Sequence, residues 1–343
     1  MAAPLHTSDI LDLVKGTLRQ LGRMKFQQIA QDIQDFEVFR RWWKKEKIVV
    51  TDGYGLQYNL MARLTNTARH VGLNTEDRTT IADVMEQLVV PWRYVNDSWG
   101  FNYVETLQNA GESMVFNIMK PRRAGCILNL AKEIETKAWS APGASNVLDP
   151  YGVPYWVVKN ATTGFNGGYP SGHSTLAGVN LSNAPNFKNY TFQYVNVSKA
   201  DAIKKLRTAH RLCQWISPVG DEGYRNGNGQ KLRWYMNEAT LSNFEDTGEA
   251  QNENLGKDVA SMDGTITLRS LPCIYIPYLD SDTTNPIYGI DHSTFWPVVL
   301  KGMFLFEHDP IRDPLKHNWY SVQVDSAYNY VCVDRRRNIV GYV

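Results

Sequence analysis

The residues best placed by type and spacing to do chemistry are Pro170, Ser171, Gly172, His173 and Ser174. A histidine set between small residues can act as a general acid, because its ordinary pKa lies near physiological pH. The chemistry that such a side chain could supply is proton transfer. Residues 161–187 are rich in Gly, Asn, Ser and Thr, so the stretch is predicted to lie in a surface loop.

The same five residues resemble the centre of the signature of acid phosphatases related to lipid phosphatases. That family also carries a Lys and an Arg-Pro pair upstream and an Arg, His and Asp segment downstream. No K-x6-RP pattern precedes the stretch, and Arg207, His210 and Arg211 follow it without the family's spacing to an Asp. The family is built from buried helices, whereas this match lies in a predicted loop. A phosphatase centred on residues 170–173 is therefore the weakest functional hypothesis, and the chain is not expected to be an enzyme.

Other motifs for cofactors and metals are incomplete. The glycines at 164, 167, 168 and 172 lack the Lys-Ser/Thr of a phosphate-binding loop. Three histidines lie near acidic residues, but no H-x3-H or H-E-x-x-H spacing places two ligands on one helix face; they are His292, His308 and His317. The sequence predicts neither a cofactor nor a metal site.

The composition is that of a folded protein without a strong electrostatic bias. Hydrophobic residues make up 43% of the 343 residues, enough for about two domains. Lys and Arg total 36 against 35 Asp and Glu, which disfavours a polybasic nucleic-acid-binding role. Four scattered cysteines without a C-x-x-C pair predict buried, reduced thiols and a cytosolic setting. Neither a membrane span nor a signal peptide is expected, because no apolar run is long enough and the start lacks a basic region followed by an apolar core.

One long helix is predicted to organise the elements around these residues. Between Pro121 and Trp139, apolar residues recur with the i, i+3, i+4, i+7 spacing of one helix face, at Ile127, Leu130, Ala131, Ile134 and Ala138. Pro121 suits the first helical turn, where its missing N–H costs nothing. Such a helix would be about 28 Å long at ~1.5 Å per residue. It could span a whole domain.

Residues 78–110 predict a long β-hairpin. Alternating aromatic and polar residues form two candidate arms, and Asn96-Asp97-Ser98 between them reads as a polar tip. A two-stranded hairpin alone is only marginally stable in water, so it must lie against its own domain or a neighbouring subunit. Helices and antiparallel strands are mixed along the rest of the chain, which predicts an α+β fold.

A basic and aromatic stretch, Phe39 to Lys47, precedes these strands. Two tryptophans alternate in it with Arg40, Arg41, Lys44 and Lys45. Basic residues interleaved with aromatics can contact nucleic acid. The more ordinary interpretation is a solvated helix face beside two packed tryptophans.

Three stretches in this order resemble the major capsid protein of tailed bacteriophages. They are ETLQNAGESMVFNIMKPRRAGCILNLAKEIETKAW, then NENLGKDVASMDGTITLRSLPCIYIPYLDSDTTNPIYGIDHSTFWPVV, and the ending YVCVDRRRNIVGYV. The resemblance covers most of the chain and implies the phage capsid fold, which encapsulin shells share. That fold has an N-terminal arm, an extended hairpin loop, a peripheral domain with a spine helix and an axial domain.

The resemblance assigns each part of the chain to a part of that fold. The N-terminal arm and first strands take residues 1–77, and the extended loop takes 78–110. The peripheral domain takes 111–197, with the spine helix at 121–139 and a loop insertion at 161–185. The axial domain takes 198–330, and a closing strand, 331–343, returns to the peripheral domain.

The function implied is a structural coat protein that self-assembles through hexamers and pentamers into an icosahedral or prolate capsid around double-stranded DNA. The implied partners are further copies of the chain, a portal protein, separate scaffolding and decoration proteins, and packaged DNA bound without sequence preference, with no membrane. Its place is the virion capsid, assembled in the host cytoplasm. An encapsulin-type shell enclosing a cargo is the alternative.

Two sets of site residues follow from this interpretation. The subunit-interface candidates are aromatic or charged residues of the hairpin and the helix: Trp92, Arg93, Tyr94, Trp99, Phe101, Tyr103, Arg122, Arg123, Glu133 and Glu135. For the charged helix residues, a merely solvated face is the competing interpretation. The candidates for contact with DNA on the inner face are Arg40, Arg41, Lys44 and Lys45.

Overall fold

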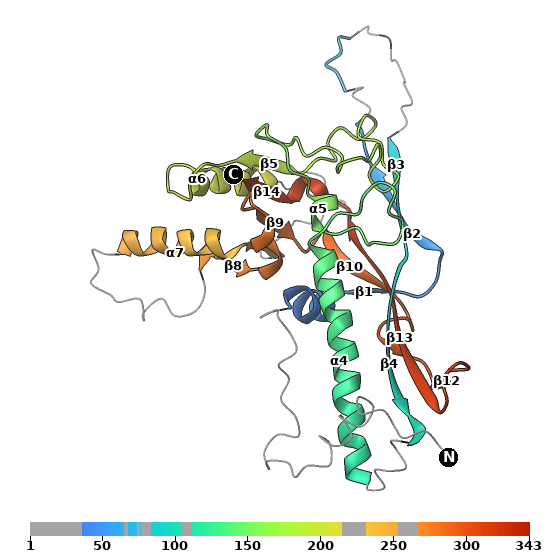
Figure 1. Cartoon of the computed structure of the whole chain (residues 1–343). Helices are drawn as coiled ribbons and strands as arrows, with labels where there is room; N and C mark the ends of the chain where they lie inside the picture. Colours follow the sequence, from blue (N-terminus) through green and yellow to red (C-terminus); the bar gives the residue numbers. More distant parts are fainter. Residues whose placement is uncertain are drawn as a thin grey trace.

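Two mixed sheets and one long helix build the molecule (Figure 1). The computed structural model describes residues 36–64, 68–73, 76, 84–104, 112–214, 231–252 and 266–343, with side chains of the helix at 112–118 and of 249–252 left out. The predicted α+β class is confirmed. Residues 1–35 of the predicted N-terminal arm lie outside the described residues.

The first sheet is organised by its longest strand, β13. Its members are β1 (Ile48–Val50), β4 (Arg93–Asn102), β10 (Phe295–Leu300), β11 (Phe306–Glu307), β12 (Ile311–Arg312) and β13 (Trp319–Cys332). One end of β13 pairs antiparallel with β4 over ten residues, and the other end pairs with β10. β1 adds to β10 in parallel, so the N-terminal segment is part of this sheet.

The long helix, α4, runs from Glu112 to Ala138 and lies beside β4 and β13 (Figure 1). It is unbroken, as predicted, but it starts nine residues earlier, so Pro121 lies inside it rather than in its first turn. An interior proline costs about 3 kcal/mol in an isolated helix. Packing outweighs this cost, since the buried face at Cys126, Leu130 and Ile134 covers the first sheet.

The second sheet carries two helices. Its strands, in spatial order, are β5 (Tyr190–Gln193), β14 (Ile339–Tyr342), β9 (Ile287–Asp291), β6 (Leu232–Met236), β8 (Leu271–Tyr275) and β7 (Thr267–Leu268). The helix α6 (Ala202–Cys213) buries Leu206 and Ala209 in the same cluster as Phe192 and Trp234 of this sheet. The helix α7 (Glu238–Asn252) follows β6. The remaining short helices are η1 (Val38–Trp42), α2 (Trp43–Lys45), α5 (Val153–Trp156), η6 (Pro277–Ser281) and η7 (Arg335–Arg337).

The predicted pairing of residues 78–110 is wrong. The hairpin consists of β2 (Gly55–Met61) and β3 (Met85–Pro91), whereas β4 pairs with β13 from Arg93↔Tyr328 to Asn102↔Trp319. The predicted tip, residues 96–98, lies within continuous strand. Both arms of the predicted hairpin exist, but each one finds its partner elsewhere in the chain.

The sheets also do not follow the predicted domain boundaries. β5 belongs to the second sheet, although the prediction groups residues 111–197 with the long helix. β10 and β13 belong to the first sheet, although the prediction assigns 198–330 to the other domain. The closing strand β14 lies between β5 and β9 in the second sheet. The chain crosses between the sheets repeatedly, which a division into sequence intervals cannot describe.

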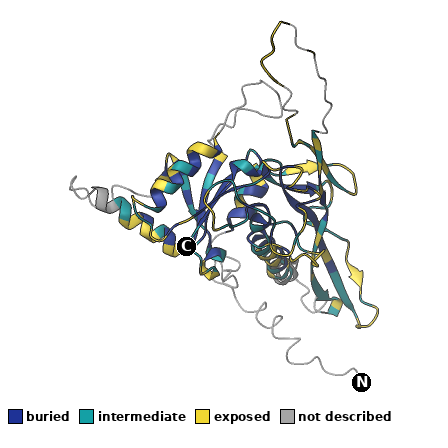
Figure 2. Ribbon diagram, turned by 90° about the horizontal axis from the view of Figure 1, so that it is seen from above, coloured by how far each residue is buried: buried dark blue, intermediate teal, exposed yellow. Residues whose placement is uncertain are grey.

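Six of the nine tryptophans among the described residues are buried, and the four cysteines are free and buried as predicted. The largest cluster contains Trp42 and Trp43, so the tryptophans of the basic stretch are core residues. Figure 2 shows buried residues gathered in the middle of the molecule, with exposed residues on the surrounding loops. Burial raises the pKa of the thiols of Cys126 and Cys273 to about 12, so both resist ionisation.

Glu135 fastens the N-terminal segment to α4. Its carboxylate accepts hydrogen bonds from the backbone N–H groups of Val38 (2.9 Å) and Phe39 (3.3 Å) and from Trp139 Nε1 (3.2 Å). The side chain is buried, so the prediction that it faces a neighbouring subunit or solvent is wrong. Burial raises the pKa of Glu135 to about 8, against the opposing effect of the three donors.

A carboxyl group whose pKa is raised on folding stabilises the folded state at low pH and loses that contribution as pH rises through the folded value. We therefore expect the free energy of unfolding to decrease between about pH 5 and pH 9 by a few kcal/mol more in the wild type than in Glu135→Gln, at about 1.4 kcal/mol per pKa unit. Urea titrations at pH 5, 7 and 9 measure this free energy of unfolding. Glu133→Gln, at an exposed position on the same helix, is the control and should follow the wild type. Parallel profiles for wild type and Glu135→Gln would contradict the assignment.

Candidate functional site

His173 is held by contacts that do not suit phosphate chemistry. Its Nε2 lies 3.0 Å from the carbonyl oxygen of Pro142, and its ring meets the ring of Tyr155 edge-on at 5.2 Å. His210 lies on α6, where its two ring nitrogens contact Gln214 and Arg269. A carbonyl oxygen and an aromatic ring do not bind a phosphate group. The contacts of His173 therefore indicate a structural role.

Two further histidines, His292 and His308, form pairs rather than metal sites. His292 Nδ1 lies 2.7 Å from Glu46 Oε2, and His292 Nε2 lies 2.8 Å from the hydroxyl of Tyr235. His308 Nε2 lies 2.7 Å from Asp325 Oδ2. Within the ranges that the structure describes, no three His, Cys, Asp or Glu side chains are grouped as metal ligands would be.

The predicted interface residues of the hairpin divide by strand geometry. Trp92 is buried and donates its Nε1–H to the carbonyl oxygen of Gly53 (2.8 Å), so its predicted exposure to a neighbour is wrong. Trp99 packs against buried residues of α4 and β13, and Phe101 stacks on Tyr320 with ring centroids 5.6 Å apart. Successive residues of β4 face opposite sides of the sheet.

Two members of this set are exposed. Tyr94 is 68% exposed and Tyr103 is 48% exposed. Arg93 is half-buried, with its guanidinium 5.6 Å from the ring centroid of Tyr151. Tyr94 and Tyr103 therefore stay interface candidates, whereas Arg93, Trp99 and Phe101 make their main contacts inside the chain.

The charged residues predicted on the long helix are also engaged within the chain. Arg122 donates to the carbonyl oxygen of Gly100 (3.3 Å). Arg123 forms a two-pronged ion pair with Glu307, with both N···O distances 2.7 Å. Glu133 is exposed and 3.9 Å from Lys137, and Arg123 is exposed too, so both fit a solvated face. The helix is tied to β4 and β11 by side chains that a surface pattern suggested were free.

A surface missed by the sequence interpretation lies on the β2–β3 hairpin. One face of the ribbon carries Gln57, Asn59, Met61, Met85, Gln87 and Val89, all exposed. Met61 and Met85 are cross-strand partners, and each is 50% exposed. Apolar and polar residues alternate between 56 and 64, and this pattern could have revealed the face. It indicates one strand but does not identify the strand that pairs with it.

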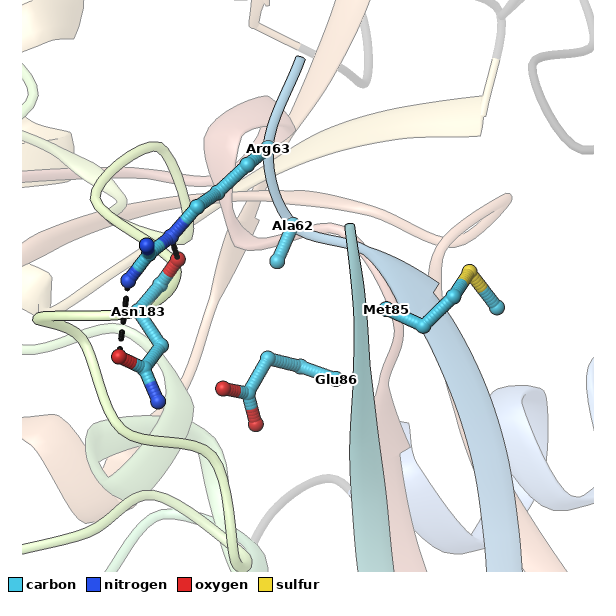
Figure 3. A pocket seen from close by; sticks show the side chains of 5 residues that line it. All are labelled: Ala62, Arg63, Met85, Glu86 and Asn183. Carbon is cyan, nitrogen blue, oxygen red and sulfur yellow. Dashed lines mark hydrogen bonds between the residues drawn. The ribbon is translucent and has the colours of Figure 1, made fainter. Parts of the chain in front are cut away.

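The end of the hairpin where Met61 pairs with Met85, next to the segment that connects the two strands, meets a loop of the body (Figure 3). A pocket of about 100 Å³ there is lined by Ala62, Arg63, Met85, Glu86 and Asn183. Arg63 reaches across to Asn183, donating from Nε to its backbone oxygen (2.5 Å) and from Nη2 to its side-chain oxygen (2.8 Å). The pocket is thus formed by a junction between two parts of one chain.

The predicted DNA-contact residues surround two buried tryptophans. Arg40, Lys44 and Lys45 are exposed, and Arg41 is half-buried with its Nη1 3.4 Å from Glu37 Oε1. They lie on η1 and α2, whose other side buries Trp42 and Trp43. Packing of the two tryptophans therefore explains the mixture of aromatic and basic residues in this stretch. The four basic residues lie on the side of η1 and α2 opposite these tryptophans.

Comparison with known proteins finds similarity in structure only. No protein-family model matches the chain, and no curated protein matches it. Among the described residues, we found no helix with the length and hydrophobicity that crossing a membrane requires.

Solved structures of capsids are similar to this chain. The capsid asymmetric unit of cyanophage A-1(L) has a TM-score of 0.58 at 12% identity, covering 85% of this chain and 89% of that one. The capsid of the native GTA particle has a TM-score of 0.58 at 10% identity, covering 94% and 95%. The capsid of Myoviridae phage XM1 has a TM-score of 0.55 at 10% identity, covering 92% and 94%. The chain therefore has the fold of tailed-phage major capsid proteins, as its sequence pattern predicted.

Proposed function

We propose that the chain is a structural coat protein that assembles through hexamers and pentamers into a closed icosahedral or prolate shell around double-stranded DNA. The observation that carries the proposal is the likeness to capsid subunits over 85–94% of this chain and 89–95% of theirs. A likeness that spans both chains nearly end to end covers the parts that would contact neighbours as well as the core. The first sheet with α4 corresponds in this proposal to the peripheral domain, and the second sheet to the axial domain.

The exposed hairpin supports the proposal independently. A two-stranded ribbon is marginally stable by itself, and Met61 and Met85 on its methionine-bearing face are each half exposed among the residues that the structure describes. Flexible thioether side chains adapt to a partner surface, so they suit a contact repeated at slightly different angles around a shell. The partner proposed for this face is a neighbouring copy of the chain. A portal protein, scaffolding and decoration proteins, and assembly in the host cytoplasm belong to the same proposal.

Assembly is the first test. We expect the purified chain to elute as large assemblies in size-exclusion chromatography, with shells tens of nanometres across in negative-stain electron microscopy. Shells that retain a protein cargo and exclude DNA would favour the encapsulin alternative. A monomer or dimer with phosphatase activity would contradict both.

The proposed contact between copies through the hairpin face is tested by introducing negative charges on that face. Met61→Asp combined with Met85→Asp places two like charges opposite each other on the exposed face, so the proposed contact between copies should be lost while the subunit stays folded. We expect soluble subunits or capsomers and at least a tenfold loss of closed shells by electron microscopy. Tyr54→Asp, at a position 97% exposed and outside both strands, is the matched control. A normal yield of shells from the double variant would refute the assignment of this face.

The proposed contact between these basic residues and DNA is tested by the salt dependence of DNA retention. Replacing Arg40, Arg41, Lys44 and Lys45 with Gln removes up to four phosphate contacts per subunit, and each lost contact reduces the salt dependence of binding. We expect shells of this variant to release DNA at lower salt than the wild type, as measured by nuclease-protected DNA. Lys204→Gln with Arg207→Gln, on the exposed side of α6, is the control. Equal DNA retention would exclude the four residues as the contact.

A further inference from the structure

The loop from residue 169 to 186, which contains the PSGHS stretch, has no part in the proposed function so far. Both of its ends are fixed by one buried side chain, Arg335. Its Nη2 donates to the carbonyl oxygen of Gly168 (3.0 Å), and its Nη1 donates to that of Phe187 (3.0 Å). The same guanidinium binds the carbonyl oxygen of Trp156 and the side-chain oxygen of Asn189. A planar guanidinium can hold several acceptors at fixed angles, so the two ends of the loop are tied to the body at one point.

Hydrogen bonds within the loop make it stiff. The hydroxyl of Tyr169 accepts from the backbone N–H of Leu181 (2.7 Å) and donates to Asn180 Oδ1 (3.0 Å). His173 is held by Pro142 and Tyr155, as described above. The loop thus has its own internal contacts in addition to the two fixed ends, as compact Ω-type loops have.

The far part of the loop is a tight turn at residues 176–179. Leu176 and Val179 exchange two backbone hydrogen bonds of 2.9 Å, and the two central residues, Ala177 and Gly178, have positive φ values of 47° and 89°. A turn with two such residues is the type I′ turn. Ala177 is strained there, because its Cβ makes the left-handed region unfavourable.

Ala177 connects the body to the hairpin. Its N–H donates to the hydroxyl of Tyr155 (2.9 Å), and its carbonyl oxygen accepts from the N–H of Val89 on β3 (2.8 Å). Tyr155 is itself buried and stacked on Tyr151 with ring centroids 4.1 Å apart. The strained residue therefore lies between a rigid support and the hairpin strand.

A second attachment holds the other strand. Arg63 follows β2 and donates from Nη2 to the carbonyl oxygen of Ser182 (3.1 Å), in addition to its two bonds to Asn183. Figure 3 shows the bonds from Arg63 to Asn183 on one side of the pocket, with Glu86 of β3 on the other. Val89 and Met85, which pairs with Met61 at the end of β2 two residues before Arg63, are about 13 Å apart along the strand at ~3.3 Å per residue. Two attachments at this spacing, one to each strand, restrain both bending and twisting of the ribbon.

We propose that residues 169–186 form a bracket that fixes the angle of the β2–β3 hairpin on its own subunit. Because the hairpin is proposed to cover a neighbouring copy, its angle determines how far adjacent subunits tilt, and hence the curvature of the shell. This second step depends on the proposed function, whereas the bracket itself does not.

The experiment combines hydrogen exchange with microscopy on the full chain. Arg63→Ala removes the second attachment and leaves Val89 unchanged. Faster amide exchange at Val89 in this variant would therefore show that residues 169–186 act as one rigid unit. We expect the exchange rate of the Val89 amide in unassembled subunits to rise about tenfold, the effect of losing a charge-assisted hydrogen bond. Shells of the variant should have a wider distribution of diameters. Arg69→Ala is the matched control, because Arg69 bonds within its own segment to the carbonyl oxygen of Glu76.

The outcomes separate the bracket itself from its proposed role in the curvature of the shell. An unchanged exchange rate at Val89 overturns the bracket, whether or not shells form. Faster exchange with an unchanged diameter distribution overturns the role in curvature. If the wild type forms no shells, the proposed function and the curvature step fail together, and the exchange rate still decides whether the bracket exists.

Discussion

The packing around Trp42 is the constraint on which the rest of the fold depends. Its ring lies 5.4 Å from that of Trp139 at the end of α4, 5.6 Å from Tyr235 in the second sheet and 5.6 Å from Phe295 in the first sheet. Its Nε1–H donates to the hydroxyl of Tyr235 (2.9 Å). The N-terminal segment, the long helix and both sheets therefore meet at one side chain. Aromatic rings bury large areas in such a contact, so a single residue can join four elements.

A buried polar group next to this ring fixes the same junction. Glu46 lies 2.5 Å from Arg233 and 2.7 Å from His292, and both of these belong to or follow strands of the second sheet. Burial opposes ionisation of Glu46, but the imidazole of His292 and the guanidinium of Arg233 outweigh it and lower its pKa. Burial lowers the pKa of His292, so its ring favours the neutral form. Removing one partner would leave the others buried without compensation, which makes the arrangement specific.

The parts of the fold that local spacing determines were predictable from the sequence. The stripe from Ile127 to Ala138 indicated the long helix, and the order of elements indicated the capsid fold. The partner of β4 was not predictable, because alternation identifies a strand but not its neighbour, and β13 lies more than 200 residues away. Asn96 and Ser98 suggested a tip because they are polar, yet both are exposed residues on the outer side of a continuous strand. A polar triplet is compatible with a strand that has one solvated face.

The site residues were predicted less well, because a charged residue type usually indicates a surface. Glu135 and Arg335 are both buried, and each is surrounded by hydrogen-bonding partners that come from distant segments. Only the fold brings Val38 to Glu135 or Gly168 to Arg335, so neither role can be inferred from neighbours in the sequence. The same reasoning applies to His173. Its motif suggested chemistry, but its partners, a carbonyl oxygen and a tyrosine ring, make it a support of the loop that holds the hairpin. In this chain the buried charged and polar groups join segments that lie far apart in the sequence.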